Sequence, residues 1–284
     1  MLQITFNNQK GLVMLKNTFS IICYAFVFFS CARYDLNSKN QITENFPPAS
    51  IIGGIELKKS DPDSKNAVLL FLDGQLCSST VIADSVLLTA AHCVADADVA
   101  NSRAIFANSW DSSREFNPKI DGAKIKYFLV HPQFNPRLGE ENILSDIALV
   151  FLNEKVPADY PVFKIADPTS LPKNGSLYLY GYGFTKYNSN DGKILRKTEI
   201  KRNKFKVINN THKVIIDQTN EIGVCMGDSG GPAFVNIQNT LQILSLSSYN
   251  TYELSQLRCS SLAYETLISP FIPWIKHAIH QNLN

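Results

Sequence analysis

The sequence feature that most constrains this chain is the hexapeptide Gly227-Asp228-Ser229-Gly230-Gly231-Pro232 near the C-terminus. Three glycines and a proline around one serine predict a tight turn, because glycine adopts backbone conformations closed to other residues and proline ends regular structure. Taken alone, the hexapeptide is compatible with a turn that has no chemical role. A chemical role requires partners elsewhere in the chain.

Two upstream segments supply such partners. Thr89-Ala90-Ala91-His92-Cys93 comes first, and Asp146-Ile147-Ala148-Leu149-Val150 lies between it and the hexapeptide. A serine hydroxyl becomes a nucleophile when a base takes its proton, and a histidine is an effective base when a third group fixes its tautomer and orientation. His92, Asp146 and Ser229 are therefore a candidate triad. Each segment alone has an ordinary structural explanation, but their joint occurrence favours catalysis.

The order and spacing of these motifs resemble the trypsin/chymotrypsin family of serine endopeptidases, and the resemblance runs from about Ile51 to the C-terminus. It implies that Ser229 is the nucleophile, His92 the general base and Asp146 the group that orients the base. It also implies that the backbone N–H groups of Gly227 and Ser229 form the oxyanion hole. Peptide hydrolysis would then proceed through an acyl-enzyme.

Activation by proteolysis is a second implication of the resemblance. Ile51-Ile52-Gly53-Gly54 matches the family's mature N-terminus, whose new α-amino group pairs with the acid at the position of Asp228 and orders the oxyanion hole. The bond to be cut follows Pro47-Pro48-Ala49-Ser50, which lacks the Arg or Lys that a trypsin-like activator recognises. A protease that prefers small residues fits this junction, and this chain is itself a candidate for that activity.

The resemblance also locates a primary specificity pocket. Its base is Gly223, six residues before the nucleophile, with Val224 beside it, and neither residue carries a charge that would select Arg or Lys. One wall would be Ser245-Leu246-Ser247, at the place of the family's Ser-Trp-Gly, with its first serine behind Asp146 and its last serine narrowing the pocket. Leu262 or a neighbouring residue would lie on the facing wall. We therefore expect cleavage after small uncharged residues; a pocket closed to all side chains is the alternative.

The chain contains six cysteines. By the resemblance, Cys77 pairs with Cys93 beside the histidine, and Cys225 pairs with Cys259 across the pocket. Disulfides form and persist in oxidising compartments, so the pairs predict an exported protein. No His/Cys pattern has the spacing of a zinc site, and neither a metal nor a cofactor is expected.

The N-terminal region has the pattern of a signal peptide. Lys16 precedes an apolar run from Phe19 to Phe29 that is too short to span a bilayer, and Met14 is a second candidate for the true start. The run ends in Phe28-Phe29-Ser30-Cys31, which resembles a bacterial lipoprotein box with Cys31 as the lipidated residue. Ordinary signal-peptidase cleavage nearby is the alternative.

These features divide the chain into a leader (1–31), a linker and pro-segment (32–50) and a peptidase domain (51–284). The lipoprotein box predicts a bacterial protein of the secreted or lipoprotein type. Its expected location is outside the cytoplasm: secreted, periplasmic, or attached to the outer membrane through a lipid on Cys31.

Short apolar runs at regular intervals predict an all-β fold. Ala67 to Leu72 and Leu76 to Ala83 flank Asp73-Gly74, which is a hairpin signal. After Ser269-Pro270, apolar residues recur at helical spacing up to Ile279, which predicts one C-terminal helix. The resemblance implies two six-stranded antiparallel barrels, about 51–160 and 161–284, with the site in the cleft between them.

The net charge of +2 gives no reason to expect a nucleic-acid partner. The resemblance implies protein or peptide substrates and protein inhibitors as partners, and we expect a monomer. Two other functions compete with proteolysis. A catalytically idle homologue that acts as a binding or regulatory module would usually lack a triad residue, and none is missing here. Hydrolase-fold esterases place the serine before the acid and the histidine, which is not the order in this chain.

Overall fold

The computed structural model describes residues 51–109, 122–138, 144–185, 191–220, 222–251, 259 and 261–283. The leader, Cys31 and the junction up to Ser50 lie outside this part of the chain. Within the described ranges, no helix is both long and apolar enough to cross a bilayer.

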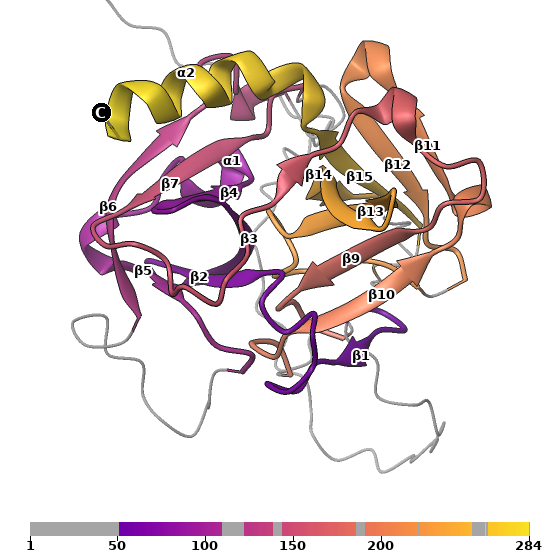
Figure 1. The fold of residues 1–284 in the computed structure, drawn as a ribbon, viewed down its shortest axis with the longest axis horizontal. Coiled ribbons are helices and arrows are strands. Elements are labelled where there is room, and N and C mark those ends of the chain that lie inside the picture. Colours follow the sequence, from indigo (N-terminus) through magenta and orange to yellow (C-terminus); the bar gives the residue numbers. More distant parts are fainter. Residues whose placement is uncertain are drawn as a thin grey trace, which may run out of the picture. The chain divides into compact units, whose positions relative to one another are not determined.

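The first half of the described chain is a closed antiparallel barrel with the strand order β2-β3-β4-β7-β6-β5 (Figure 1). Its strands are β2 (Val68–Leu72), β3 (Gln75–Ala83), β4 (Val86–Thr89), β5 (Ser102–Ile105), β6 (Ala123–Val130) and β7 (Ala148–Leu152). The predicted turn at Asp73-Gly74 joins β2 to β3, and both of its residues have positive φ, 48° and 92°. This is the geometry that a two-residue hairpin turn requires.

The strand β7 shows why several of these strands consist of apolar residues throughout, with no alternation of apolar and polar side chains. All five of its residues are buried. Ala148 and Val150 pack in the core inside the barrel, whereas Leu149 and Phe151 pack in a second core shared with the other half of the molecule. Because successive side chains of a strand point to opposite faces, a strand covered on both faces is apolar throughout.

The second half is an antiparallel sheet in the order β1-β10-β9-β13-β14-β15-β12-β11, and β8 pairs in parallel with β14. Its strands are β1 (Ile55–Glu56), β8 (Lys164–Ile165), β9 (Leu177–Gly181), β10 (Arg196–Ile200), β11 (Phe205–Ile208), β12 (Lys213–Asp217), β13 (Pro232–Ile237), β14 (Thr240–Asn250) and β15 (Leu262–Leu267). The predicted all-β class is confirmed, with an open sheet of nine strands in place of a second closed six-stranded barrel.

The predicted C-terminal helix is also confirmed. The helix α2 (Ile272–Leu283) follows the 3₁₀ turn η7 (Ser269–Phe271), and it lies along the barrel above β6 and β7 (Figure 1). Ile275 and Ala278 are its buried residues. The other short helices are α1 (Ala91–Val94), η1 (Val99–Asn101), η2 (Pro136–Leu138), η4 (Pro168–Ser170), η5 (Arg202–Lys204) and η6 (Asn209–Thr211).

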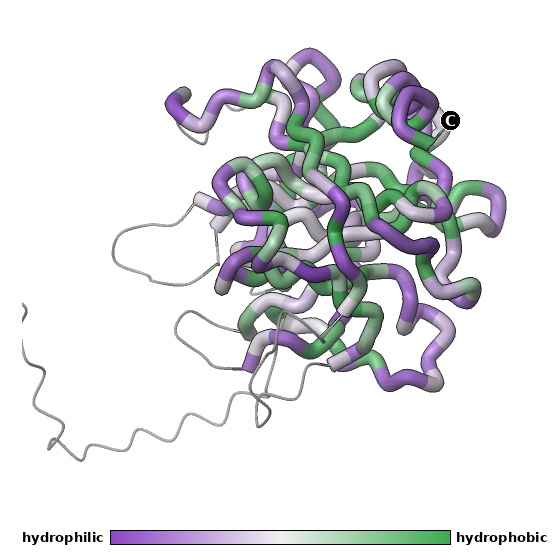
Figure 2. The backbone as a smooth tube through the Cα atoms, turned by 90° about the vertical axis from the view of Figure 1, so that its left-hand side faces the viewer, coloured by the Kyte–Doolittle hydropathy of each residue, from purple (hydrophilic) through white to green (hydrophobic). Residues whose placement is uncertain are grey.

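One hydrophobic core joins the barrel to the sheet. Leu88 and Leu149 of the barrel pack in the same cluster as Phe234 and Leu246 of the sheet and Phe271 of η7. Figure 2 shows the same distribution along the backbone, with hydrophobic residues gathered in the interior and hydrophilic residues at many outer turns. This shared core fixes the two halves against each other where the candidate site lies.

Candidate active site

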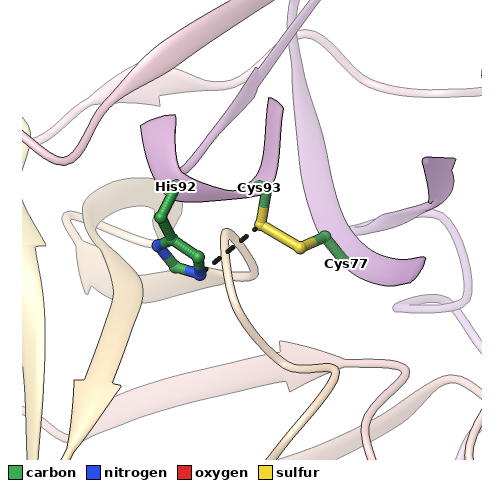
Figure 3. Close-up of side chains that lie close together, drawn as sticks. All are labelled: Cys77, His92 and Cys93. Atoms are coloured by element: carbon green, nitrogen blue, oxygen red, sulfur yellow. Dashed lines mark hydrogen bonds between the residues drawn. A yellow bond between two sulfur atoms is a disulfide. The ribbon is translucent and has the colours of Figure 1, made fainter. Parts of the chain in front are cut away.

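His92 is positioned by the end of a barrel strand. The strand β4 ends at Thr89, and His92 lies in α1, the single helical turn that follows. Its neighbour Cys93 forms a disulfide with Cys77 on β3 (Figure 3). The turn that carries the histidine is therefore covalently tied to the adjacent strand, and a closed loop of this length contributes about 3 kcal/mol to stability.

Asp146, just before β7, faces His92. Its carboxylate accepts hydrogen bonds from His92 N (2.9 Å), His92 Nδ1 (2.7 Å) and Ser248 Oγ (2.5 Å). Burial acts to raise the pKa of Asp146, but the hydrogen bonds from His92 and Ser248 outweigh burial, so the pKa lies below its ordinary value. An ionised Asp146 holds the proton of the imidazole on Nδ1 and leaves Nε2 as the basic nitrogen.

The Nε2 atom of His92 lies 3.7 Å from Cys93 Sγ (Figure 3). Cys77, His92 and Cys93 thus bring three potential ligand atoms within 4.8 Å of one another. Both sulfurs belong to the disulfide, whereas zinc binds thiolates, so these residues do not form a zinc site.

The loop that carries Ser229 is held by both halves of the molecule. On the barrel side, Ser78 of β3 donates its N–H to Ser229 O (2.8 Å) and its Oγ–H to Gly227 O (3.0 Å). On the sheet side, Gly230 N–H donates to Ser247 O (2.7 Å). The loop of Ser229 is therefore fixed to β3, the strand that is also tied to the turn of His92 by the Cys77–Cys93 disulfide.

Gly230 is the point where this loop comes closest to the barrel. Its φ is +74°, and a Cβ there would lie 2.1 Å from Thr89 Oγ1 and 2.5 Å from Ser78 O. Thr89 Oγ1 is itself fixed, because it donates to Ser78 O at 2.8 Å. Both the backbone conformation and the lack of space require glycine at this position.

Asp228 is fully buried beneath the same loop. Its carboxylate accepts hydrogen bonds from the N–H groups of Gly183 (2.8 Å) and Cys225 (2.8 Å). Burial raises the pKa of Asp228 to about 7, against the opposing effect of these two bonds. Ile51 is fully buried as well, and the residue after it forms a β-bridge with Gly223, close in sequence to Asp228. The start of the described chain therefore packs in the half of the molecule that contains this acid.

The predicted base of the pocket lies against a buried glutamine. Gln218 accepts a hydrogen bond from Val224 N (2.5 Å) and donates to Val224 O (3.2 Å) and Cys259 O (2.9 Å). A Cβ on Gly223 would lie 1.9 Å from Gln218 Oε1, so the glutamine packs directly behind it. The second disulfide joins Cys225, the residue after Val224, to Cys259, whose carbonyl accepts from Gln218. Gly223 and Val224 are thus backed by a neutral amide whose oxygen and nitrogen are both hydrogen-bonded.

The structure corrects the expected pocket wall. Ser248, and not Ser245, is the serine that donates to Asp146. Ser245 Oγ and Ser247 Oγ instead both donate to the carboxylate of Glu265, the second at 3.3 Å. Ser245 and Ser247 therefore line the contact between two sheet strands rather than a substrate pocket.

A β-bulge is the physical reason for this difference. The register between β14 and β15 shifts between Ser247 and Tyr249, and the extra residue, Ser248, bonds to Asp146 and not to Glu265. The segment whose first serine bonds to Asp146 is therefore Ser248-Tyr249-Asn250, three residues later than the segment expected from the sequence. The aromatic side chain at its second position, as in the family's Ser-Trp-Gly, was the signal that identifies it.

Two further residues near the site were missed from the sequence. Glu265 is fully buried, and burial raises its pKa to about 7 although two serine hydroxyls donate to it. Asn250 donates from Nδ2 to Val224 O at 3.3 Å and so links the corrected wall to the base. Leu262, expected on the facing wall, is partly buried on β15, and its carbonyl accepts from Thr251 N (2.8 Å).

These contacts place the three candidate residues on the class of fold used by β-barrel serine proteases. The family model for trypsin matches residues 52–275, so the chain belongs to the trypsin family.

The relatives of the chain are animal proteins of low identity. It is similar to chymotrypsin-like elastase family member 1 of Felis catus (26% identical over 84% of this chain and 94% of that protein) and of Canis lupus familiaris (24% over 82% and 94%). Spermosin of Halocynthia roretzi is 26% identical over 62% of this chain and 47% of its own length. These relatives do not support the bacterial type that we expected from the leader.

Proposed function

We propose that this protein is a serine endopeptidase that hydrolyses peptide bonds by way of an acyl-enzyme. The observation that carries the proposal is the buried, ionised Asp146 bonded to the imidazole of His92, beside a Gly-Asp-Ser-Gly-Gly loop held by both halves of the molecule. The trypsin-family match supports the same reaction class. Asp146 would orient His92, and His92 would activate Ser229.

In this mechanism, His92 Nε2 takes the hydroxyl proton of Ser229 as Oγ attacks the carbonyl carbon of the substrate. Negative charge then develops on the substrate oxygen, towards which the N–H groups of Gly227 and Ser229 would point. The protonated His92 gives its proton to the leaving amine, and the C–N bond breaks. Water, activated by the same imidazole, hydrolyses the ester and restores Ser229.

Activation of the proposed enzyme involves Ile51 and Asp228. Cleavage of the Ser50–Ile51 bond would create an α-ammonium group on a residue whose side chain is already buried. The carboxylate of Asp228 is desolvated, with a pKa of about 7, and an ammonium group beside it would favour its ionised form. We expect the uncut chain to be nearly inactive, and Asp228→Asn to leave a folded but weak enzyme after cleavage; full activity of the uncut chain would contradict this.

The substrate preference proposed for the enzyme is a small uncharged residue before the cleaved bond. Gly223 and Val224 are backed by the neutral Gln218, and burial of an unpaired Arg or Lys charge there would be costly. The elastase-like relatives are consistent with this proposal. The two disulfides support export to an oxidising compartment. Lipidation of Cys31 stays a prediction.

A fluorophosphonate probe tests the proposed function. It should attach to Ser229 in protein cut at Ser50–Ile51, and Ser229→Ala should abolish labelling and lower kcat by about 10⁴- to 10⁶-fold. Asp146→Asn should lower kcat by about 10⁴-fold, because it favours the wrong tautomer of His92. Ser60→Ala, at an exposed turn, is the matched control and should change neither property. Absence of labelling in folded, correctly cut protein would refute the proposal.

A further inference from the structure

The side chain of Asn250 crosses the region between the corrected wall and the base of the primary pocket. It lies at the end of β14, two residues after Ser248, whose hydroxyl faces Asp146. The amide of Asn250 lies against the predicted base of the pocket, because it donates a hydrogen bond to Val224 O. Its Nδ2 reaches Val224 O at 3.3 Å, five residues before the nucleophile Ser229.

The two ends of the Asn250 amide differ in their bonding. Val224 O can only accept, so the end that faces it must be the NH₂ group, and this fixes the other end as the carbonyl oxygen Oδ1. That oxygen is buried and has no hydrogen-bond partner among the described residues. The neighbouring amide of Gln218, in contrast, accepts from Val224 N and donates twice. Asn250 therefore presents an unused acceptor.

Buried acceptors without a partner are rare in native structures, and one that lies in a binding region calls for a donor from the ligand. We propose that Asn250 Oδ1 accepts a hydrogen bond from the hydroxyl of a serine or threonine side chain at the position before the cleaved bond. This inference rests on the proposed function and narrows its substrate class from small uncharged residues to small hydroxyl residues.

The geometry also limits the size of that side chain. Asn250 Nδ2 and Gln218 Nε2 both donate to Val224 O, so two amide side chains already occupy the space around this carbonyl, and we expect a long or aromatic substrate side chain to be rejected. The expected cleavage junction agrees with this proposal, because the residue before Ile51 is Ser50. A hydroxyl-selective pocket would let the enzyme cut its own precursor.

The test compares the rates at which the processed enzyme cleaves substrates with and without a side-chain hydroxyl. Peptide anilides that differ only before the cleaved bond are paired as Thr against Val and Ser against Ala. We expect kcat/KM to be about tenfold higher for the hydroxyl member of each pair, the effect of one hydrogen bond to an otherwise unpaired acceptor. An equal or higher kcat/KM for Val than for Thr would overturn the proposal.

Variants separate the hydrogen bond from the bulk of the side chain. Asn250→Leu keeps the branched shape of the side chain, with greater bulk, and removes both polar ends of the amide, so the Thr/Val ratio should fall to about one while Phe is still rejected. Asn250→Gly should admit Phe. Thr251→Val, at the next residue, whose hydroxyl bonds Leu262 O, is the matched control and should keep the wild-type ratio.

Titration with fluorophosphonate gives the folded, active fraction of each preparation, so a misfolded variant is not mistaken for a change in preference. Failure of the wild-type protein to react with the probe would refute the proposed function itself. Reaction of the probe with Ser229, together with a Thr/Val ratio that is the same in Asn250→Leu and in wild type, would overturn only the assignment of Asn250.

Discussion

Gly230→Ala should disrupt the nucleophile loop far more than an ordinary glycine substitution in a turn. An alanine at a φ of +74° costs about 1 kcal/mol in backbone strain. Its Cβ would also lie 2.1 Å from Thr89 Oγ1 and 2.5 Å from Ser78 O, distances that force the loop or the barrel strand to move. Overpacking of this kind costs a further 1–3 kcal/mol, roughly, which gives a total of about 2–4 kcal/mol.

Gly74 provides the matched control. Its φ is +92°, but nothing lies within 4 Å of the position where a Cβ would be. Gly74→Ala therefore isolates the backbone strain, about 1 kcal/mol. For a domain of this size, 1 kcal/mol lowers the melting temperature by about 2–4 °C, so we expect a loss of about 3 °C for Gly74→Ala and about 6–12 °C for Gly230→Ala.

Thermal unfolding and the rate of fluorophosphonate labelling measure the two consequences separately. Gly230→Ala should also slow labelling of Ser229 by tenfold or more, because the displaced loop carries the nucleophile. Gly74→Ala, at the β2–β3 turn, should leave the labelling rate unchanged, because nothing lies within 4 Å of the added Cβ. Equal losses of melting temperature in the two variants, or normal labelling of Gly230→Ala, would refute the close-contact argument.

Three further predictions follow from buried polar groups. Burial raises the pKa of Glu265 to about 7 in the folded protein, against 4.5 in the unfolded chain. Between these two values the folded protein holds a proton that the unfolded chain has released, so the free energy of unfolding falls as the pH rises from 4.5 to 7. Glu265→Gln should gain melting temperature relative to wild type at pH 8 but not at pH 4.5; a pH-independent difference would contradict this. His131 packs edge-on against the rings of Phe271 and Trp274, and burial lowers its pKa from 6.5. The unfolded chain therefore binds a proton more readily at this residue, and the free energy of unfolding should fall as the pH drops below about 6.5. His131→Phe should abolish that part of the pH dependence of the melting temperature. Ser248→Ala removes a hydrogen bond that holds the Asp146 carboxylate in place, so kcat should fall, whereas Ser245→Ala should leave kcat unchanged; the opposite result would restore our original assignment of the wall.

The barrel strands were predictable because their sequence pattern reflects burial on both faces. The run Val68–Leu72 and the run Ala148–Leu152 are apolar throughout, since each strand contacts one core inside the barrel and another against the sheet. Short apolar runs bounded by turn residues carry this information locally, and the Asp73-Gly74 turn supplied the first connection.

The strand β10 was not predictable in the same way. It reads Arg-Lys-Thr-Glu-Ile, yet Arg196 is buried. The guanidinium is accommodated because Glu56 lies 2.8 Å away and two backbone carbonyls accept from it. The partner lies far away in the chain, so no local pattern distinguishes this strand from an exposed basic segment.

The error at the pocket wall has a related cause. The run Ser245-Leu246-Ser247-Ser248 offers more than one serine for the place behind Asp146, and spacing alone does not choose among them. The choice depends on the bulge at Ser248 and on Glu265 of the neighbouring strand, which takes the hydroxyls of Ser245 and Ser247. Both are properties of strand pairing, which the sequence of one strand does not contain.

The short strand β1 bears on the order in which the molecule is assembled during synthesis. All six strands of the barrel lie between Val68 and Leu152, so the ribosome has delivered every one of them before β8 and the later strands of the sheet emerge. The segment before the barrel cannot form its strand pairs at that stage, because Ile55–Glu56 pairs with β10 and the residue after Ile51 pairs with Gly223. The segment that is synthesised first among the described residues therefore pairs only after β10 and Gly223 have been synthesised. Contacts between segments so far apart in the chain form late and slowly. Until those strands are complete, the stretch that begins at Ile51 has no docking place.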